Sequence, residues 1–285
     1  MERARTVVIS GASTGIGAAC ALHLDRLGFT VFAGVRRETD GVVLGAKASP
    51  RLQPVLLDVT DAASIDQARQ LVTGLVGEVG LAGLVNNAGI AVAGPLEAVP
   101  IPDLRRQFEV NVIGQVAVTQ AFLPLLRKGR GRVVNMGSIA GRAALPLMGP
   151  YSASKFALEA LTDALRLEVQ QWGIQVSIVE PGAIATPIWE KSGAKADELE
   201  ASTVGELKDL YAAVVAGVRG RVAEAAARAI PAEAVARAVE HALTADRPKT
   251  RYLVGRDATL RAIMVKLLPD RLSDRLMTRI LNLPH

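Results

Sequence analysis

The stretch Thr6-Val-Val-Ile-Ser-Gly-Ala-Ser-Thr-Gly-Ile-Gly17, near the amino end of the 285-residue chain, decides the fold. Its first five residues have the short apolar pattern of a buried strand, and an alanine-rich helical segment follows the glycines as far as Leu27. In such a strand–turn–helix unit, Gly11 permits a tight turn, Gly15 lets the backbone approach a pyrophosphate, and Gly17 lets the helix pack against the strand. The amino end of the helix then offers free amides to phosphate groups. The pattern predicts a dinucleotide site, and a glycine-rich turn without a ligand is the alternative.

Strand and helix patterns alternate along most of the chain. The predicted strands are Thr6–Ser10, Thr30–Val35, Gln53–Asp58, Gly83–Asn86, Arg132–Met136, Gln175–Glu180 and Tyr252–Val254, and the predicted helices are Gly15–Leu27, Asp61–Val79, Ile101–Leu126, Tyr151–Trp172 and Ala232–Ala245. This alternation predicts an α/β fold with a doubly wound parallel sheet and covering helices. Because the chain has no internal repeat and no low-complexity linker, we expect one domain over residues 1–255 and an extension over 256–285.

Composition narrows the class of protein. Half of the residues are hydrophobic and only 4% are aromatic, which suits aliphatic strands buried on both faces. The net charge of +5 comes from scattered basic residues without interleaved aromatic residues, which argues against nucleic-acid binding. Three isolated histidines and one cysteine make no recognisable metal site, and Cys20 is expected to fill the core. A single cysteine, no signal-peptide pattern and no uninterrupted apolar run that could span a bilayer together predict a cytoplasmic location.

The segment Tyr151-Ser-Ala-Ser-Lys155 predicts acid–base chemistry. On a helix, this spacing places the phenol and the ammonium on one face, one turn apart. A free tyrosine titrates near pH ~10, and a neighbouring positive charge lowers the phenol pKa toward the working range. Tyr151 and Lys155 are therefore candidates for a catalytic pair, and a surface tyrosine and lysine that share a helix by accident are the alternative.

Together these motifs resemble those of the short-chain dehydrogenase/reductase family in its common single-domain form. The resemblance runs from Thr6 to about Gly255, with the motifs in the family's order and spacing. Gly11-x-x-x-Gly15-x-Gly17 is similar to the family's cofactor loop, and Asn86-Asn-Ala-Gly89 is similar to its fourth-strand motif.

Four side chains match the family's catalytic positions, namely Asn111, Ser138, Tyr151 and Lys155. The resemblance implies that Ser138 orients the substrate oxygen and that Tyr151 passes a proton to or from it. Lys155 is implied to lower the tyrosine pKa and to hold the nicotinamide ribose, and Asn111 to anchor a water in a proton relay. Gly137 is a small departure, because many relatives carry a second, non-catalytic serine there.

The resemblance also implies a Rossmann-type site for NADP or NAD across the carboxyl ends of the strands. Besides Tyr151 and Lys155, the residues implied to bind the cofactor are Gly11, Ser13, Thr14, Gly15, Ile16, Gly17, Arg36, Asp58, Val59, Asn87, Ala88, Gly89, Pro181, Gly182, Ile184 and Thr186. In this set, Asp58 is implied to contact the adenine, and the segment after Pro181 is implied to close on the nicotinamide.

The end of the second predicted strand bears on the choice between NADP and NAD. NAD-dependent relatives place an acidic residue there, whereas this chain has Val35 followed by Arg36 and Arg37. A guanidinium can bind the extra phosphate of NADP through paired, charge-assisted hydrogen bonds, so Arg36 favours NADP. Thr14 weighs against this preference, because many NADP-dependent relatives have a basic residue at that position. A solvated pair of arginines is the alternative.

Two segments exceed what a minimal member of the family needs. The insertion at 188–230 carries an apolar helical stripe and predicts a lid over the substrate, with a permanently docked helical pair as the alternative. This stripe consists of Leu207, Leu210, Tyr211, Val214, Val215 and Val218. The extension carries two more stripes, formed by Leu260, Ile263, Met264, Leu267 and Leu268, and by Leu272, Leu276, Met277, Ile280 and Leu281. Packing within a homodimer or homotetramer is favoured over contact with an anionic membrane surface.

The predicted function is NAD(P)-dependent interconversion of a secondary alcohol and a ketone or aldehyde. The regions Gly28–Arg36 and Asp103–Asn111 resemble those of hydroxysteroid, retinol and hydroxybutyrate dehydrogenases, which implies an apolar small-molecule substrate. Two alternatives stay open: a non-catalytic NAD(P)-sensing protein on the same fold, and an epimerase or dehydratase of the same family.

Overall fold

The computed structural model describes residues 5–188, 193, 197 and 206–281. Within them, seven parallel strands form one sheet in the order β3-β2-β1-β4-β5-β6-β7. The strands are β1 (Thr6–Ile9), β2 (Thr30–Val35), β3 (Leu52–Leu56), β4 (Gly83–Asn86), β5 (Arg132–Met136), β6 (Gln175–Pro181) and β7 (Arg251–Val254). The strand order reverses between β1 and β4, and this switch point is where a doubly wound sheet opens a crevice at its carboxyl edge. The predicted doubly wound parallel sheet is confirmed.

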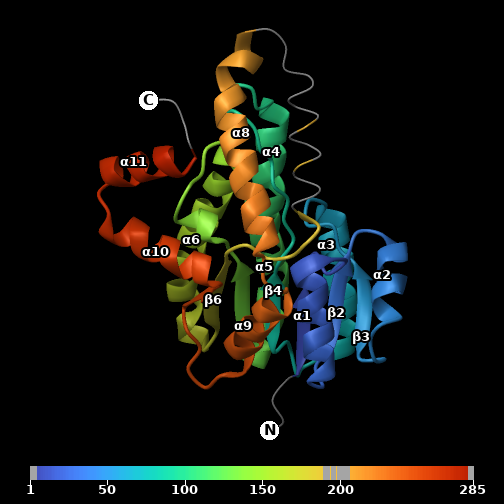
Figure 1. Cartoon of the computed structure of the whole chain (residues 1–285). Helices are drawn as coiled ribbons and strands as arrows, with labels where there is room; N and C mark the ends of the chain where they lie inside the picture. The colour runs from blue at the N-terminus through green and yellow to red at the C-terminus, as the bar shows by residue number, and fades with distance from the viewer. Residues whose placement is uncertain (1–4, 189–192, 194–196, 198–205, 282–285) are drawn as a thin grey trace.

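Helices cover both faces of the sheet (Figure 1). They are α1 (Gly15–Arg26), α2 (Glu38–Gly45), α3 (Ala62–Val76), α4 (Ile101–Phe108), α5 (Gly114–Gly129), α6 (Gly149–Val169), α8 (Glu206–Ala227), α9 (Glu233–Thr244), α10 (Arg256–Leu267) and α11 (Asp270–Ile280), with short π or 3-10 turns at Glu109–Ile113, Ile139–Gly141 and Gln170–Trp172. Alternate residues of β1 serve the two faces: Val7 and Ile9 pack in the cluster with α1 and α9, and Val8 packs in the cluster with α3 and α5. Strand β1 is therefore apolar on both sides.

Besides shifts of one to three residues at the ends of several elements, three details differ from the predicted elements. Helix α2 was not predicted, because its eight residues include two glycines and show no clear apolar stripe. Strand β3 begins at Leu52 and runs through Pro54, which an edge strand tolerates because one side of its backbone forms no ladder. The predicted helix Ile101–Leu126 is interrupted by the π-helical turn Glu109–Ile113. Among the described residues, the segment Ile101–Gly129 is long and apolar enough to cross a membrane by length and composition alone, and half of the relevant window is buried inside the protein.

The insertion leaves and re-enters the domain at one point. Ile184 and Ile230 form a parallel bridge, in which the amide of Ala185 donates to the carbonyl of Ile230 over 3.0 Å. Helix α8 rises above the carboxyl edge of the sheet (Figure 1), and the hydroxyl of its Tyr211 donates to Glu97 over 2.9 Å. Of the predicted stripe, Val218 is buried, Leu207, Tyr211, Val214 and Val215 are partly buried, and Leu210 is 66% exposed. Residues 189–192, 194–196 and 198–205 of the predicted lid lie outside the described residues.

Helix α10 of the extension buries a face that its predicted apolar stripe does not include, whereas the second predicted stripe is buried or partly buried except at Leu272. Helix α10 packs through Ala258 and Ala262 against Ile139, whereas Leu260 and Leu267 of the predicted stripe are 60% and 72% exposed. Small alanine side chains allow the close approach that the leucine face does not. Helix α11 follows, and Leu281 beyond it is buried against Gly217 of α8, where a Cβ would collide with the Leu281 carbonyl.

Candidate active site

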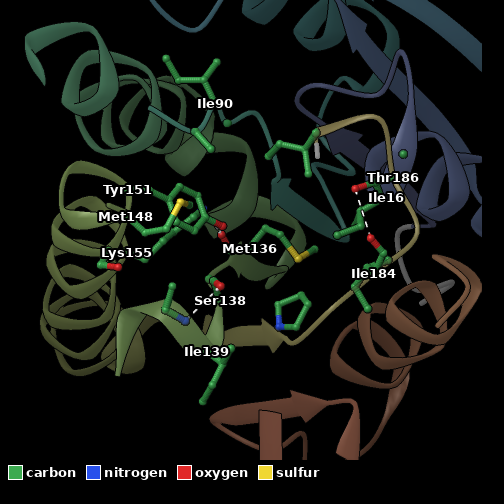
Figure 2. A pocket seen from close by; sticks show the side chains of 18 of the residues that line it. Ile16, Ile90, Met136, Ser138, Ile139, Met148, Tyr151, Lys155, Ile184 and Thr186 are labelled. Carbon is green, nitrogen blue, oxygen red and sulfur yellow. Dashed lines mark hydrogen bonds between the residues drawn. The ribbon is translucent and has the colours of Figure 1, made fainter. Parts of the chain in front are cut away.

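A cavity of about 1050 Å³ opens at the carboxyl edge of the sheet. Its floor consists of the segments that follow β1, β4, β5 and β6, and its upper walls come from α8, α10, α11 and the segment before α6. Figure 2 shows Ser138, Tyr151, Lys155 and Met148 on one side of this hollow, with Ile16, Ile184 and Thr186 on the other. The fold therefore joins motifs that lie far apart in the sequence.

The glycine loop forms a cradle that side chains would fill. Gly11 and Gly15 have φ of +64° and +59°, which residues with a Cβ rarely adopt. A Cβ on Gly11 would lie 2.7 Å from the Cα of Ala88, and one on Gly15 would lie 3.3 Å from Thr186. Gly17 lies behind the loop, where a Cβ would collide with the carbonyl of Gly11. Its role is packing of α1 rather than contact with the cavity.

Except for Gly17, every residue predicted to bind the cofactor lines this cavity; these are Gly11, Ser13, Thr14, Gly15, Ile16, Arg36, Asp58, Val59, Asn87, Ala88, Gly89, Tyr151, Lys155, Pro181, Gly182, Ile184 and Thr186. The arrangement fits a dinucleotide, because an open glycine cradle meets the amino end of α1 at the switch point of the sheet. The sequence analysis missed several apolar lining residues, including Ile90, Met136, Leu145 and Met148. The signal that could have indicated them is that they lie close in sequence to the motif residues.

Ser10 connects two sides of the floor, a role that the sequence analysis missed. Its hydroxyl accepts hydrogen bonds from the backbone amides of Asn87 and Ala88, both over 3.1 Å. The Asn87 side chain donates in return to the carbonyl of Gly11 over 2.9 Å. These bonds hold the loops after β1 and β4 in one rigid arrangement.

The two arginines at the end of β2 have different surroundings. Arg36 lines the cavity close to Asp58, whereas Arg37 forms an exposed ion pair with Asp40 over 2.9 Å. Partial burial would raise the pKa of Asp58, but hydrogen bonds from Thr60 and the charge of Arg36 outweigh burial and lower that pKa. The cavity therefore has an ionised carboxylate and a guanidinium side by side at this end.

Ser138, Tyr151 and Lys155 meet where β5 ends against α6. Lys155 is buried, and its Nζ donates a hydrogen bond to the carbonyl of Met136 over 2.7 Å. The same Nζ lies 5.7 Å from the centroid of the Tyr151 ring. Burial lowers the pKa of Lys155 to about 8, against the opposing charge of Glu159.

The pKa of the Tyr151 phenol differs from the expectation based on the nearby charge of Lys155. Burial raises its pKa, and a hydrogen bond with Ser138 only partly offsets that increase. The expected lowering by Lys155 is therefore wrong for this arrangement, because desolvation of the phenolate dominates. Tyr151 is protonated at neutral pH and can donate a proton to an oxygen held by Ser138.

Asn111 lies behind the cavity wall rather than in it. Its Oδ1 accepts from the amide of Ile90 over 2.8 Å, and its Nδ2 donates to the hydroxyl of Ser154 over 3.1 Å. Ser154 donates in turn to the carbonyl of Tyr151 over 2.7 Å. Asn111 sits in the π-helical turn and braces the catalytic end of α6, and π turns often occur at functional positions.

The glycine at position 137 has a packing reason. A Cβ on Gly137 would lie 2.9 Å from the side chain of Ile178 and 3.1 Å from the carbonyl of Val179. Strand β6 therefore leaves little room for the serine that many relatives carry at this position.

A dinucleotide cradle facing a Ser–Tyr–Lys cluster defines a nucleotide-dependent oxidoreductase, and comparisons with known proteins identify its family. Residues 5–197 match the family model described as short chain dehydrogenase. The chain is 36% identical over 283 residues to an NADPH-dependent 3-dehydrocapnine reductase from Ornithobacterium rhinotracheale, covering 98% of each chain. It is 40% identical over 293 residues to Retinol dehydrogenase 5 from Mus musculus, covering 98% of this chain and 89% of the other.

A solved short chain dehydrogenase from Burkholderia cenocepacia J2315, in complex with NADP, superposes with a TM-score of 0.73 at 26% identity and covers 98% of each chain. This protein belongs to the short chain dehydrogenase family. It is an oxidoreductase that acts on alcohol or ketone groups with NADP or NAD, as the sequence predicted.

Proposed function

We propose that this enzyme interconverts an apolar secondary alcohol and its ketone, with NADP as the preferred cofactor. The observation that carries the proposal is the meeting of Ser138, Tyr151 and Lys155 on one wall of a cavity whose opposite wall is the glycine cradle. The cofactor supplies or accepts the hydride, and the protein supplies orientation and proton transfer.

Each polar side chain has a separate task in the proposed reaction. Ser138 holds the substrate oxygen by a hydrogen bond, and Tyr151 donates its phenolic proton to that oxygen during reduction. The ammonium of Lys155, fixed on the carbonyl of Met136, stabilises the phenolate that remains and holds the nicotinamide ribose. Asn111 acts as a positioning residue, because its bonds to Ile90 and Ser154 fix the first turn of α6.

The preference for NADP rests on Arg36. Arg36 lines the cavity, and the neighbouring Arg37 is engaged with Asp40. A guanidinium beside the ribose of adenosine binds a phosphate group there with charge-assisted hydrogen bonds. An NADPH-dependent reductase and a structure that holds NADP among the relatives support the same choice.

The apolar character of the substrate follows from the upper walls of the cavity. Residues from α8, α10 and α11 give this part a hydrocarbon and thioether lining. Such a pocket gains affinity from buried apolar surface. Relatives named retinol dehydrogenase and 17-beta-hydroxysteroid dehydrogenase type 6 support an apolar substrate.

We also propose a homodimer or homotetramer formed through α5 and α6, in the cytoplasm. Phe156 and Leu167 of α6 and Ile113 before α5 are exposed apolar side chains that a partner subunit would cover. Light scattering tests the assembly: a mass of two or four times 30.0 kDa is expected, and a mass of one chain would contradict it. Cell fractionation tests the location.

Steady-state turnover tests the proposed reaction directly. A panel of aliphatic and cyclic ketones and their alcohols is assayed with NADP(H) and with NAD(H). We expect turnover of apolar substrates, with higher kcat/KM for the NADP pair. Binding of NADP without turnover of any panel member would instead support a non-catalytic nucleotide-binding protein.

A further inference from the structure

Two arginines bring positive charge into the apolar upper part of the cavity. Beyond the catalytic serine, the lining is mainly hydrocarbon and thioether, from Leu145, Met148, Val218, Val222, Met264 and Met277. Arg261 of α10 and Arg221 of α8 belong to the same lining, close enough for their charges to interact. A cation in such surroundings costs free energy unless a partner compensates it, so these arginines call for an explanation beyond packing.

Arg261 is held in a fixed position relative to the catalytic serine. Its helix packs through Ala258 and Ala262 against Ile139, the residue directly after that serine. Its Nη2 donates a hydrogen bond to the carbonyl of Ala143 over 3.2 Å. A guanidinium has five N–H donors in a planar fork, so this bond leaves donors for a ligand in the cavity.

The described residues around Arg261 balance its charge only in part. Burial lowers the pKa of Arg261, Asp257 opposes that change, and the charge of Arg221 adds to it. Asp257 also has a second interaction, because its carboxylate accepts a hydrogen bond from the backbone amide of Ala183 over 2.8 Å. Arg221 forms an ion pair with Glu224 in which both side chains are about half exposed, and such surface pairs contribute little and rearrange readily. An anion between the two guanidiniums would remove their mutual repulsion.

We propose that the substrate is amphipathic, with an apolar body in the cavity and an acidic head group, a carboxylate or a sulfonate, bound by Arg261 with Arg221 as the second donor. This inference rests on the proposed function, because the reacting carbon must lie at Ser138 and Tyr151. Arginine suits the head group, since its fork binds two acidic oxygens at once. The distance from the head group to the reacting carbon then selects the substrate.

Matched substrates and variants test the acidic head group. The substrates are oxododecanoic acids with the ketone at carbon 4, 6, 8 or 10, their methyl esters, and the corresponding keto-sulfonates. The variants are Arg261→Met, which keeps length without charge, Arg261→Lys, which keeps charge without the fork, and Arg256→Ala. Arg256 is exposed on the same helix outside the cavity lining and is the control. Calorimetry of the hydroxydodecanoic acid that corresponds to the preferred ketone, and of its methyl ester, with the NADPH-bound enzyme measures binding independently of turnover, because an alcohol and the reduced cofactor do not react with each other.

We expect an acid at one chain position to have a kcat/KM about tenfold or more above that of its ester, mainly through KM. Arg261→Met should remove this preference by lowering kcat/KM for the acid far more than for the ester, Arg261→Lys should retain part of the preference, and Arg256→Ala should change neither substrate. Equal kcat/KM for acid and ester, or an equal loss on both in Arg261→Met, would overturn the inference. Turnover of the esters with no acid preference leaves the proposed function standing. Arg261-dependent binding of the acid without any turnover would overturn the proposed function and support the head-group site.

Discussion

At the scale of single residues, the chemistry of the site depends on how burial changes the pKa of each polar side chain. Tyr151 and Lys155 share one helix face, but desolvation moves their two pKa values in opposite senses, the phenol upward and the ammonium down to about 8. The phenol thus remains a proton donor. The lysine stays largely charged at neutral pH and stabilises the anion that proton donation leaves behind.

Replacing Tyr151 by Phe is expected to abolish turnover and to leave NADP affinity nearly unchanged. The ring still packs, but the proton donor at the substrate oxygen is lost. Steady-state rates and NADP titration measure the two effects. Tyr211→Phe is the matched control, because that tyrosine is on the outer part of α8 and bonds to Glu97. A Tyr151→Phe enzyme with more than about a tenth of the wild-type rate would refute the acid–base role.

Replacing Arg36 by Ala is expected to weaken NADP binding by about 1–3 kcal/mol, the scale of a charged hydrogen bond. NAD affinity should change little, since NAD lacks the phosphate that Arg36 binds. Arg37→Ala is the control, because Arg37 pairs with Asp40 outside the cavity lining. Dissociation constants for both nucleotides decide the matter, and tighter wild-type binding of NAD than of NADP would reverse the assignment.

At the scale of elements, α8 and the segment that ends at Leu281 form the upper wall of the cavity together. Val218 and Val222 of α8 line the hollow, and so do Met277 and Leu281 of the extension. Their contact is close at Gly217, which has no room for a Cβ. A glycine in the middle of a helix costs about 1 kcal/mol relative to alanine, so its presence here indicates a packing requirement.

Gly217→Ala is expected to push Leu281 away from α8 and raise KM for apolar substrates severalfold. Gly220→Ala is the control, because no described atom lies within 4 Å of a Cβ at that position. The control should stabilise α8 by up to about 1 kcal/mol through helix propensity alone. Denaturant unfolding and KM measure both variants. Identical behaviour of the two would mean that the contact with Leu281 does not shape the cavity.

The sequence predicted the elements whose patterns are strong and missed those decided by packing partners. The strands at Thr30–Val35 and Arg132–Met136 matched to the residue, because buried parallel strands are continuous apolar runs. The motif residues of the cavity followed from their spacing. By contrast, α10 buries Ala258 and Ala262 rather than its leucines, and Arg261 enters the cavity, because periodicity identifies an apolar face without saying which face the fold covers. The effect of burial on Tyr151 likewise depends on neighbours distant in sequence.

At the scale of the whole molecule, a network of buried and partly buried charges joins α6 to β6, to β7 and to the segment after Ile139–Gly141. Arg251 of β7 pairs with Glu159 over 3.1 Å and with Asp163 over 2.6 Å. Arg142 donates to Glu180 of β6 over 2.7 Å. Burial and the charge of Glu180 raise the pKa of Glu159 to about 7, although Arg251 and Arg142 oppose the increase.

This network gives the fold a pH dependence of definite sign. A carboxyl group with a raised pKa binds its proton more tightly in the folded state, so its stabilising contribution is present below its ordinary pKa of 4.5 and is lost as pH rises through about 7. The free energy of unfolding should therefore fall between pH 5 and pH 8, and Glu159→Gln should reduce that slope. Asp66→Asn is the control. The pKa of the exposed Asp66 is lowered, so the ionisation of this group affects stability only at more acidic pH. Urea unfolding at several pH values measures the slope, and an unchanged slope in Glu159→Gln would assign it to other groups.

The position of Leu281 has a practical consequence for handling the protein. This residue is 2% exposed, lines the cavity and follows directly on α11. A purification tag or fluorescent fusion joined to the chain after Leu281 would therefore be attached close to the active-site wall. The amino-terminal end of the described chain lies on the opposite side of the molecule from α8 (Figure 1), so a tag joined before Thr6 would lie away from the catalytic chamber.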